Sequence, residues 1–474
     1  MAKKYEPTIG LEIHTELKTN TKMFCSCKND LEEKRPNINV CPVCMAHPGT
    51  LPVMNKEAIK SVLKVGMALD GRIADYTEFD RKNYFYPDIP KGYQISQYKH
   101  PLVLGGELVG VKITRIHLEE DTAKSVHDRG DFSLIDYNRA GVPLMELVTE
   151  PVIKDGATAV KFAKELQLIL RYLNVSDADM EKGQMRLETN ISVSENKNKL
   201  GTKVEVKNLN SFRSVGLAID YEIKRQTDVL ERGEEIKQET RGWNENKQET
   251  FSQREKESSH DYRYFPEPDL PKLKISEIEE FSKKSLSKEI PELPSEKRER
   301  YKKEYGIKDE NIEIYITNEK LRSLFEETIK EFKNNKNLIK LVSNYITSDI
   351  VGFSKGENGV VGKIEPKNLA RMIEMIEESL ISSRGAKDVL LMMYEKGGNP
   401  KEIAKSKNLL QVSDENRLKK IVEKVIKNNQ KVIETYKNGN EASLQYLVGQ
   451  GMKESGGSAN PNALKKLIIS ALSS

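Results

Sequence analysis

Residues 8–18 alternate between apolar and polar side chains, and this period of two is typical of a β-strand with one buried face. The apolar face is expected to carry Ile9, Leu11, Ile13 and Leu17. The polar face is expected to carry Glu12, His14 and Glu16. Because one strand cannot bury a face by itself, the pattern requires a sheet with a second layer packed on its apolar side. Glu12 and His14 then converge on one spot of the opposite side.

The region that follows mixes strands with helices. Sequence patterns predict further strands at 111–116 and 203–206, and apolar residues at helical spacing predict a packed helix over 157–173. Two prolines within residues 290–294 mark a break, because proline removes a backbone donor and fixes φ.

Beyond this break the chain is rich in Lys, Glu, Ile and Leu and is expected to be helical. Ser295 is expected to cap the next helix and Gly306 to end it. Further helices are expected at 319–333, 338–350, 366–378 and 386–394. A second break at 396–400 precedes a small helical tail.

The composition indicates a globular chain of two to four domains, with 474 residues of which 37% are hydrophobic and 32% charged. No apolar run approaches the roughly 20 residues of a transmembrane helix, and the first residues lack the apolar core of a signal peptide. We therefore expect a cytoplasmic protein that does not enter a membrane. The net charge of +4 does not by itself indicate a nucleic-acid binder.

All four cysteines lie close together, as Cys25, Cys27, Cys41 and Cys44. Disulfides are unusual in a cytosolic protein of this size, whereas two such pairs suit a tetrahedral zinc site. Four thiolates leave no open position, so the zinc would be structural. The alternative is a reduced cluster without metal.

Two segments far apart in the chain share an unusual composition. Residues 79–98 and 259–271 each set an Arg beside a Tyr/Phe cluster and continue into a proline-stiffened run. Aromatic rings, cations and a rigid loop suit stacking on a planar anionic ligand such as a nucleotide. The alternative is an ordered surface loop whose tyrosine rings pack on the core.

Several acidic residues could bind a divalent cation. Glu119, Glu120 and Asp121 are consecutive, and Glu146 lies between Met145 and Leu147, where an acid is costly to bury unless a cation pairs with it. Together with Glu12 and His14, they suit Mg²⁺, which prefers oxygen ligands and shares its shell with phosphates. The alternative is that residues 119–121 form a solvated acidic turn.

These motifs together resemble a known family, the B subunits of the bacterial aspartyl/glutamyl-tRNA amidotransferase. The resemblance rests on the two cysteine pairs and on six segments: Gly10-Leu-Glu-Ile-His-Thr-Glu-Leu17, Asp80-Arg-Lys-Asn-Tyr-Phe-Tyr-Pro-Asp88, His117-Leu-Glu-Glu-Asp121, Lys207-Asn-Leu-Asn-Ser-Phe212, Asp261-Tyr-Arg-Tyr-Phe-Pro-Glu-Pro-Asp269 and Leu447-Val-Gly-Gln450. It runs from end to end of the chain.

The resemblance implies an α+β cradle domain over residues 1–290, with a fold like that of glutamine synthetase and guanido kinases and an antiparallel sheet flanked by helices. It implies an all-α helical domain over 291–405 and an all-α tail that binds tRNA over 406–474. In the tail, Lys419, Lys420, Lys453, Lys465 and Lys466 would contact phosphates. The implied reaction is ATP-dependent amidation of Glu-tRNA(Gln) or Asp-tRNA(Asn) through a phosphorylated acyl group. Ammonia would come from a partner glutaminase (amidase) subunit, with a small third subunit completing a heterotrimer.

The resemblance also implies roles for individual residues. The magnesium shell would be Glu12, His14, Glu120 and Glu146. If His117, Glu119 and Asp121 share one strand face, Glu120 points the other way, so Glu119 is the reserve ligand. Residues expected to position ATP, ammonia or the end of tRNA are Lys82, Tyr84, Tyr86, Lys207, Asn208, Arg263 and Tyr264. Glu188 stands where the family usually places Asp, which leaves its reach in question.

Two other functions remain possible on the residues alone. A zinc-ribbon RNA-binding protein without catalysis would explain the cysteines and the tail, but it leaves Glu12, His14 and Glu146 without a purpose. A ligase that amidates a free amino acid would not need the tail. The residues do not decide which misacylated tRNA is the substrate, or whether the tyrosines stack on ATP or on the terminal adenosine of tRNA.

Overall fold

The structure is a computed structural model that describes residues 4–30, 32–127, 130–196, 199–255, 262–333, 335–354, 361–411, 415–437, 439–456 and 459–473. It divides into two compact units, Met1–Leu293 and Pro294–Ser474. The three-part division expected from the sequence stays a prediction. Of the segment 259–271, residues 259–261 lie outside the described part of the chain.

The first unit is built on a sheet that has ten strands in the described part of the chain. Its central strand is β1 (Glu6–Glu16), which pairs antiparallel with β11 (Pro143–Thr149) on one side and β12 (Met185–Ser194) on the other. The strand order is β15-β14-β13-β12-β1-β11-β8-β6-β2, and β7 pairs with β8. The further strands are β2 (Arg72–Ile73), β6 (Val103–Leu104), β7 (Glu107–Leu108), β8 (Val111–Glu120), β13 (Val204–Leu209), β14 (Glu239–Asn244) and β15 (Glu249–Glu255). The expectation of an antiparallel sheet needs one correction: β13 and β14 are parallel, so the sheet is mixed.

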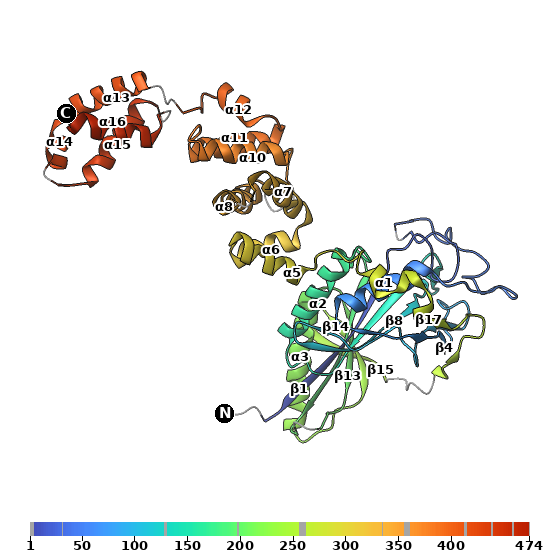
Figure 1. Ribbon diagram of the computed structural model, residues 1–474. Coiled ribbons are helices and arrows are strands. Elements are labelled where there is room, and N and C mark those ends of the chain that lie inside the picture. Colours follow the sequence, from blue (N-terminus) through green and yellow to red (C-terminus); the bar gives the residue numbers. More distant parts are fainter. Residues whose placement is uncertain are drawn as a thin grey trace. The chain divides into compact units, whose positions relative to one another are not determined.

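Helices cover the apolar face of this sheet (Figure 1). They are α1 (Lys56–Ala68), α2 (Gly156–Tyr172) and α3 (Phe212–Glu231). Asp155 and Ser211 cap α2 and α3 by accepting hydrogen bonds from the backbone N–H groups of Thr158 and Ser214. The predicted helix over 157–173 is thereby confirmed.

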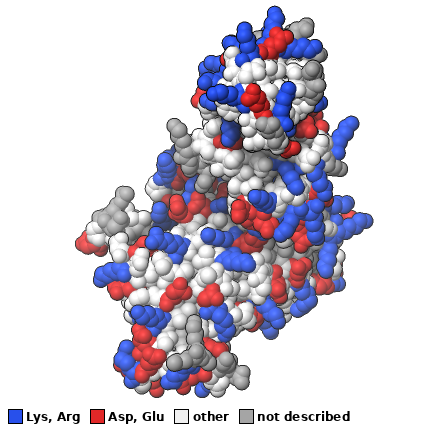
Figure 2. Space-filling model, turned by 90° about the vertical axis from the view of Figure 1, so that its left-hand side faces the viewer, with Lys and Arg blue, Asp and Glu red and all other residues white. Residues whose placement is uncertain are grey.

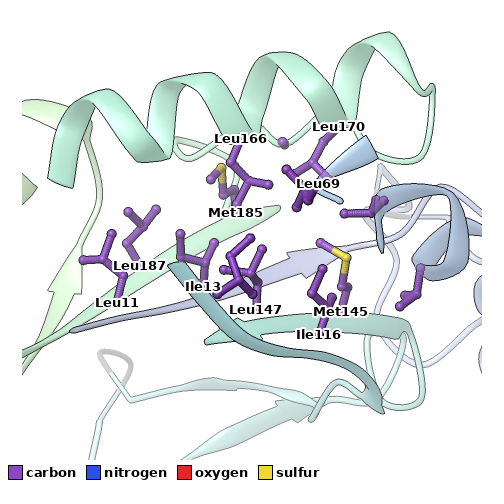
Figure 3. Packing of buried hydrophobic residues seen from close by; sticks show 14 of the residues in the cluster. Leu11, Ile13, Leu69, Ile116, Met145, Leu147, Leu166, Leu170, Met185 and Leu187 are labelled. Carbon is purple, nitrogen blue, oxygen red and sulfur yellow. The ribbon is translucent and has the colours of Figure 1, made fainter. Parts of the chain in front are cut away.

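Figure 3 shows the buried side chains of α2 facing those of the strands. Leu166 of the helix lies next to Met185 of β12, and Leu170 lies next to Leu69; both leucines of the helix, like Leu11 and Ile13 of β1, are at most 1% exposed. Burial of this apolar layer stabilises the unit by roughly 2 kcal/mol for each large side chain removed from water. The predicted apolar face of the first strand is therefore the inner face of the core.

A small second sheet lies beside the polar face at β8. It consists of β16 (Phe265–Pro266), β4 (Asp80–Asn83) and β5 (Tyr93–Ser96), in that order. Its link to β8 is made by side chains: the Leu118 N–H donates to Gln97 Oε1 at 3.0 Å, and the Ile95 N–H donates to the Glu120 carboxylate at 2.9 Å. The two aromatic segments of the sequence therefore pair with each other, since Phe265 lies opposite Arg81.

Smaller elements complete the first unit. They are β3 (Tyr76–Thr77), β9 (Lys124–Val126), β10 (Leu134–Asp136), β17 (Leu273–Lys274) and α4 (Lys283–Leu286). A loop between β1 and α1 carries the four cysteines.

The second unit is helical in its described residues. Its first helix, α5 (Pro294–Arg300), begins one residue before the expected cap, so Ser295 lies inside it. The helix continues as a π-helical turn, Tyr301–Tyr305, and ends at Gly306, whose φ of 63° is favourable for glycine. The next helices are α6 (Asp309–Thr317), α7 (Glu319–Ile329), α8 (Lys336–Asn344), α9 (Val351–Phe353), α10 (Pro366–Glu377), α11 (Ser383–Lys396) and α12 (Pro400–Ser406). All four predicted helical stretches of this region are confirmed.

The end of the chain forms a helical cluster with its own core. Its helices are α13 (Glu415–Asn428), α14 (Gln430–Lys437), α15 (Ala442–Glu454) and α16 (Pro461–Ser473). Leu418, Val422, Leu447, Leu464 and Ile468 are buried together at its centre. Such a compact cluster agrees with the small helical tail expected from the sequence.

Charges on the surface are interspersed rather than segregated. Figure 2 shows Lys and Arg side chains among Asp and Glu over the face that it displays, in keeping with the net charge of +4. Within the described residues, no helix is both long enough and apolar enough to cross a membrane.

The half-buried carboxylate of Glu326, in α7 of the second unit, yields a test of the stability of that unit. Glu326 Oε1 accepts hydrogen bonds from Lys297 Nζ at 2.7 Å, Arg300 Nη2 at 3.0 Å and the Tyr301 hydroxyl at 2.7 Å. Burial opposes its ionisation, but the hydrogen bond from Lys297 and its other partners hold the pKa of Glu326 below the ordinary value.

We expect Glu326→Gln to destabilise this unit by about 1.5–3 kcal/mol at neutral pH, because hydrogen bonds to a charged group are lost. A lowered folded-state pKa stabilises above the ordinary pKa of glutamate, and this contribution disappears as the pH falls through the lowered value. Calorimetry of the full chain at several pH values checks this. Glu327→Gln, which removes an exposed carboxylate paired with Lys330, is the matched control and should change little. A wild-type advantage that persisted in strong acid would contradict the assignment.

Candidate active-site cleft

The polar face of the central strands carries a row of acidic and imidazole side chains. The register sets His14 of β1 directly opposite Glu146 of β11, and Glu146 directly opposite His117 of β8. Cross-strand neighbours on one face have Cβ atoms about 5 Å apart, so the three side chains are forced into contact. The expected convergence of Glu12 and His14 on one spot is part of this row.

Distances within the row are short. His14 Nε2 lies 3.4 Å from Glu119 Oε1, 3.4 Å from Glu146 Oε2 and 3.9 Å from Glu12 Oε1. His117 Nε2 lies 3.4 Å from the same Glu146 oxygen. Two overlapping sets, Glu12/His14/Glu146 and His117/Glu119/Glu146, each bring their ligand atoms within 4.8 Å of one another. Either set could hold a divalent cation.

The row is also electrostatically strained in a way that a cation would relieve. Burial, and next the charge of Glu146, raise the pKa of Glu12 to about 7. Burial opposes the charging of His14, but its hydrogen bonds to Glu119 and Glu146 raise the pKa of the imidazole well above its ordinary value. Burial likewise opposes the ionisation of Glu146, yet the neighbouring His117 and His14 hold the pKa of this carboxyl well below its usual range. Three carboxylates therefore share this site with two imidazoles as their nearest basic partners.

Glu120 does not belong to this row, which corrects the expected ligand set. Because side chains alternate along β8, His117 and Glu119 face the cleft and Glu120 faces the other way. There its carboxylate accepts a hydrogen bond from the Ile95 N–H at 2.9 Å and pairs with Lys91. Glu119, the reserve candidate, occupies the place expected for Glu120, and no bulge interrupts the strand at this point.

A second acidic group continues the row toward β13. Glu12, Glu188 and Glu205 each place one carboxylate oxygen within 4.8 Å of those of the other two. Lys207 Nζ lies 2.8 Å from Glu188 Oε2 and 4.0 Å from Glu205 Oε2. The side chain of Glu188 thus reaches the cleft although it is one methylene longer than the expected Asp.

The proline-stiffened aromatic segments supply a cation and rings to the same cleft. Lys82 Nζ lies 5.6 Å from the ring centroid of Tyr84 and 5.0 Å from that of Tyr262, within cation–π range. Burial opposes the charge of Lys82, but the nearby Glu119, followed by Tyr264, Tyr84 and Glu146, holds its pKa well above the ordinary value. Tyr264 stacks on Tyr98 with 4.2 Å between ring centroids.

An ion pair ties these two segments together. Arg81 Nε and Nη2 each donate to one oxygen of Glu267 at 2.7 Å. The forked geometry makes this pair strong and directional, and the Glu267 side chain is fully buried. The segments therefore form one structure that brings Lys82 to the row of carboxylates and imidazoles.

The cleft is lined from both sheets. One half is lined by His14, Tyr84, Tyr86, Asp88, Gln94, Asp121, Thr122, Arg139, Leu144 and Arg186. The other half is lined by Ser96, Gln97, Tyr98, Arg115, His117, Glu146, Lys203, Glu205, Thr240 and Tyr264. Glu188 also lines the first half, and five residues line both halves: Glu12, Lys82, Glu119, Lys207 and Tyr262. The expected residues Glu12, His14, Glu146, Lys82, Tyr84, Tyr86, Lys207 and Tyr264 thus meet in one place.

Two expected site residues lie elsewhere. Arg263 is exposed and is not among the side chains that line the cleft, and its backbone carbonyl accepts a hydrogen bond from Asn83 Nδ2 at 2.9 Å. Asn208 is also exposed and adopts a φ of 64°, where Asn is tolerated better than most residues. It lies where the register between β12 and β13 shifts, so it shapes the strand that carries Lys207. We therefore do not place either side chain in the cleft.

Sequence reasoning missed several cleft residues, among them His117, Arg115, Arg139 and Arg186. A signal existed for His117, which is two positions from Glu119 on one strand and so must share its face. Arg186 is likewise two positions from Glu188. No local pattern marked Arg139, because the loop that carries it meets β8 only in the folded chain.

The four cysteines form a separate cluster in the loop before α1. Their sulfurs all lie within 4.8 Å of one another, and a tetrahedral zinc with bonds of about 2.3 Å needs sulfurs about 3.8 Å apart. Hydrogen bonding between Cys25 and Cys44 lowers the pKa of Cys44 to about 4 and raises the pKa of Cys25, so Cys44 is the first of this pair to become the thiolate that binds metals. Lys22, which is fully buried, places Nζ 3.8 Å from Cys44 Sγ. The donor set and the adjacent cation both suit a metal bound by four thiolates.

Comparison with known proteins identifies the family. Residues 7–280 match the family described as "GatB/GatE catalytic domain", and residues 323–472 match the "GatB domain". The chain is 43% identical to the B subunit of the aspartyl/glutamyl-tRNA(Asn/Gln) amidotransferase of Persephonella marina, over 98% of this chain and 99% of that protein. It is 44% identical to the corresponding proteins of Caldanaerobacter subterraneus and Thermoanaerobacter pseudethanolicus, over 99% of this chain and all of each relative. This chain therefore belongs to the family of B subunits of the aspartyl/glutamyl-tRNA(Asn/Gln) amidotransferase.

Proposed function

We propose that this chain amidates misacylated Glu-tRNA(Gln), Asp-tRNA(Asn) or both, in an ATP-dependent reaction carried out in the cleft. The observation that carries the proposal is the row of Glu12, His14, Glu119 and Glu146 beside Lys82, in a chain that matches the named B subunits from end to end. Carboxylates, imidazoles and a half-buried ammonium in one cleft suit phosphoryl transfer, which depends on positioning and charge neutralisation.

A side-chain carboxylate is a poor electrophile because its leaving group would be an oxide. Transfer of the γ-phosphoryl group of ATP to the carboxylate makes phosphate the leaving group, and ammonia then displaces it to form the amide. In this scheme Lys82 and Lys207 neutralise phosphate oxygens as point charges. Lys82 is held toward the row by the rings of Tyr84 and Tyr262, so little reorganisation is needed as charge develops.

We assign the cation site to Glu12, His14, Glu119 and Glu146, with His117 behind Glu146. Their oxygens fit Mg²⁺, which when bound neutralises charge on the transferred phosphoryl group and on the acyl oxygen. Among the described residues His117 Nδ1 has no hydrogen-bond partner, so this ring is held mainly through Nε2. The orientation of that ring thereby depends on Glu146.

The tyrosines Tyr84, Tyr86 and Tyr264 supply planar faces for a base. Tyr86 is 48% exposed, so its ring is accessible from solvent. Either the adenine of ATP or the terminal adenosine of tRNA would stack there, since every base has a π-face.

Zinc in the cysteine cluster would be structural, because four thiolates close its coordination shell. The tail would bind tRNA through Lys419, Lys420, Lys453, Lys465 and Lys466, which are all exposed. Ammonia would come from a partner glutaminase subunit, with a small third subunit completing the complex. The mixed sheet with helices on one face fits a cradle like that of glutamine synthetase and guanido kinases, and reduced cysteines fit the cytoplasm.

The first test replaces the carboxylate at the centre of the row. In the full chain assembled with its partner subunits, Glu146→Gln should lower the rate of ATP-dependent amidation roughly 100-fold or more, because several kcal/mol of transition-state stabilisation are lost. The measurement follows phosphate release and product tRNA with ammonium chloride as nitrogen donor.

Binding of tRNA should stay within about twofold of wild type, as the tail is untouched. Glu150→Gln is the matched control, because Glu150 follows the same strand but hydrogen-bonds Thr114 instead. Normal ATP consumption by the Glu146 variant would remove this residue from the site. Equal activity of the wild type on free glutamate would favour the ligase for free amino acids.

The second test separates Glu119 from Glu120. With Mn²⁺ as a paramagnetic probe, Glu119→Gln should weaken binding at least about tenfold, because a direct oxygen ligand is lost. Glu120→Gln should leave the affinity within about twofold, since its side chain points to Lys91 on the other face. The reverse order of effects would restore Glu120 to the shell.

The third test concerns the cysteines. Cys44→Ser should abolish stoichiometric zinc and lower the Tm by at least about 4 °C, because the loop loses the metal that organises it. Turnover per folded molecule should fall much less, as the cluster is distinct from the row at Glu146. Ser26→Ala, in the same loop, is the control. A wild-type chain that carries no zinc after expression with zinc in the medium would refute the assignment.

A further inference from the structure

We propose that Arg139 and Arg186 form a binding site for a substrate oxyanion, a carboxylate or a phosphate, at the end of the cleft beyond His14. The inference rests on the proposed function, because it takes the cleft as the place of reaction. Neither arginine was marked by the sequence, and both line the cleft.

One buried carboxylate holds both guanidinium groups. Asp121 Oδ2 accepts a hydrogen bond from Arg139 Nε at 2.6 Å and from Arg186 Nη2 at 3.0 Å. Asp121 is 5% exposed, and its other oxygen accepts the Thr122 N–H at 2.9 Å. Asp121, which is itself held by a hydrogen bond, therefore holds both arginines in place.

The other edges of the guanidinium groups remain open. Arg139 Nε also lies 3.3 Å from Glu16 Oε1, but no further N–H of Arg139 or Arg186 has a partner among the described residues. Their side chains are 30% and 32% exposed. A guanidinium presents five donors in a planar fork, and the unused donors here suit the two oxygens of a carboxylate or phosphate.

The two arginines lie near one end of the polar face of β1, and Lys207 lies near the other. Glu12 lies near Lys207 and Glu188, His14 lies opposite Arg186 in the register, and Glu16 lies beside Arg139. Because a strand rises about 3.3 Å per residue, Glu12 and Glu16 are separated by roughly 13 Å. The proposed cation row therefore lies between a lysine end and an arginine end of one cleft.

Phosphoryl transfer requires this kind of arrangement. The attacking and leaving oxygens lie roughly in line on opposite sides of the transferred phosphorus, and both reactants are anionic. Two cationic ends can hold one reactant each, whereas a single cluster would draw them to the same side. Both ends are partly neutralised, Lys207 by Glu188 at 2.8 Å and the arginines by Asp121 at 2.6 and 3.0 Å. Only the arginine end, however, offers planar guanidinium forks that match the two oxygens of an oxyanion.

The test uses the full chain assembled with its partner subunits and ammonium chloride as nitrogen donor. In Arg186→Gln and Arg139→Gln, the KM of the reactant bound at this end should rise roughly 10- to 100-fold, as expected for lost hydrogen bonds to a charged group. A rise in the KM of ATP alone assigns the site to the triphosphate. A rise in the KM of the aminoacyl-tRNA alone assigns it to the side-chain carboxylate. Equilibrium binding of ATP in the absence of tRNA provides a readout independent of turnover.

Two controls accompany these variants. Arg171→Gln removes an exposed arginine of α2 that bonds the Asp177 carbonyl, and should change neither KM. Arg186→Lys and Arg139→Lys keep the charge but lose the fork, and should recover only part of the affinity. They also carry the test if a Gln variant has a lowered Tm.

Changes below about twofold in both KM values and in ATP binding, with normal Tm, would overturn the proposal. A wild type and an Arg171 variant that both fail to amidate tRNA would instead refute the proposed function. The two failures are therefore distinguishable.

Discussion

The pleat of the central strand β1 is the constraint on which the rest of this structure depends. Ile13 points into the core beneath α2, and its neighbours Glu12 and His14 consequently point to the other side, where pairing with β11 delivers Glu146. A shift of one residue in this register would expose the core and bury the acids, at a cost far above the stability of a domain. Burial of the apolar layer therefore stabilises a sheet whose other face holds carboxylates that repel one another.

The carboxylates of this site lie close to one another. Glu12, Glu119 and Glu146 share a small volume with two imidazoles, and the raised pKa of Glu12 reflects this crowding. A cation between the oxygens removes the conflict, which is why we interpret the row as a binding site and not as a structural ion-pair network. In our proposal, the lysine and arginine ends on either side hold anionic substrates by the same attraction between opposite charges.

Much of the architecture could be predicted from local patterns. The first strand, the helix over 157–173 and the helices of the second unit follow from periodicity that depends on near neighbours. The parallel pairing of β13 with β14 is the pairing that an intervening helix, α3, favours, but neither α3 nor β14 was predicted from the sequence, so this pairing was missed. The exposure of Arg263 and Asn208 could not be predicted from the motifs that contain them, because a motif does not specify the direction of a side chain in a loop or at a register shift.

The sequence by itself determined which residues could serve: a polar strand face with Glu12 and His14, an isolated Glu146, four clustered cysteines and two aromatic segments. It left open whether Glu119 or Glu120 joins the row, although strand parity favoured Glu119. Only the tertiary structure decided this, and only it brought Lys82 and Arg139 to the same cleft. The physical reason is that alternation and helical spacing are local properties of the chain. Register and strand pairing depend instead on contacts between distant segments, which burial of the common core selects.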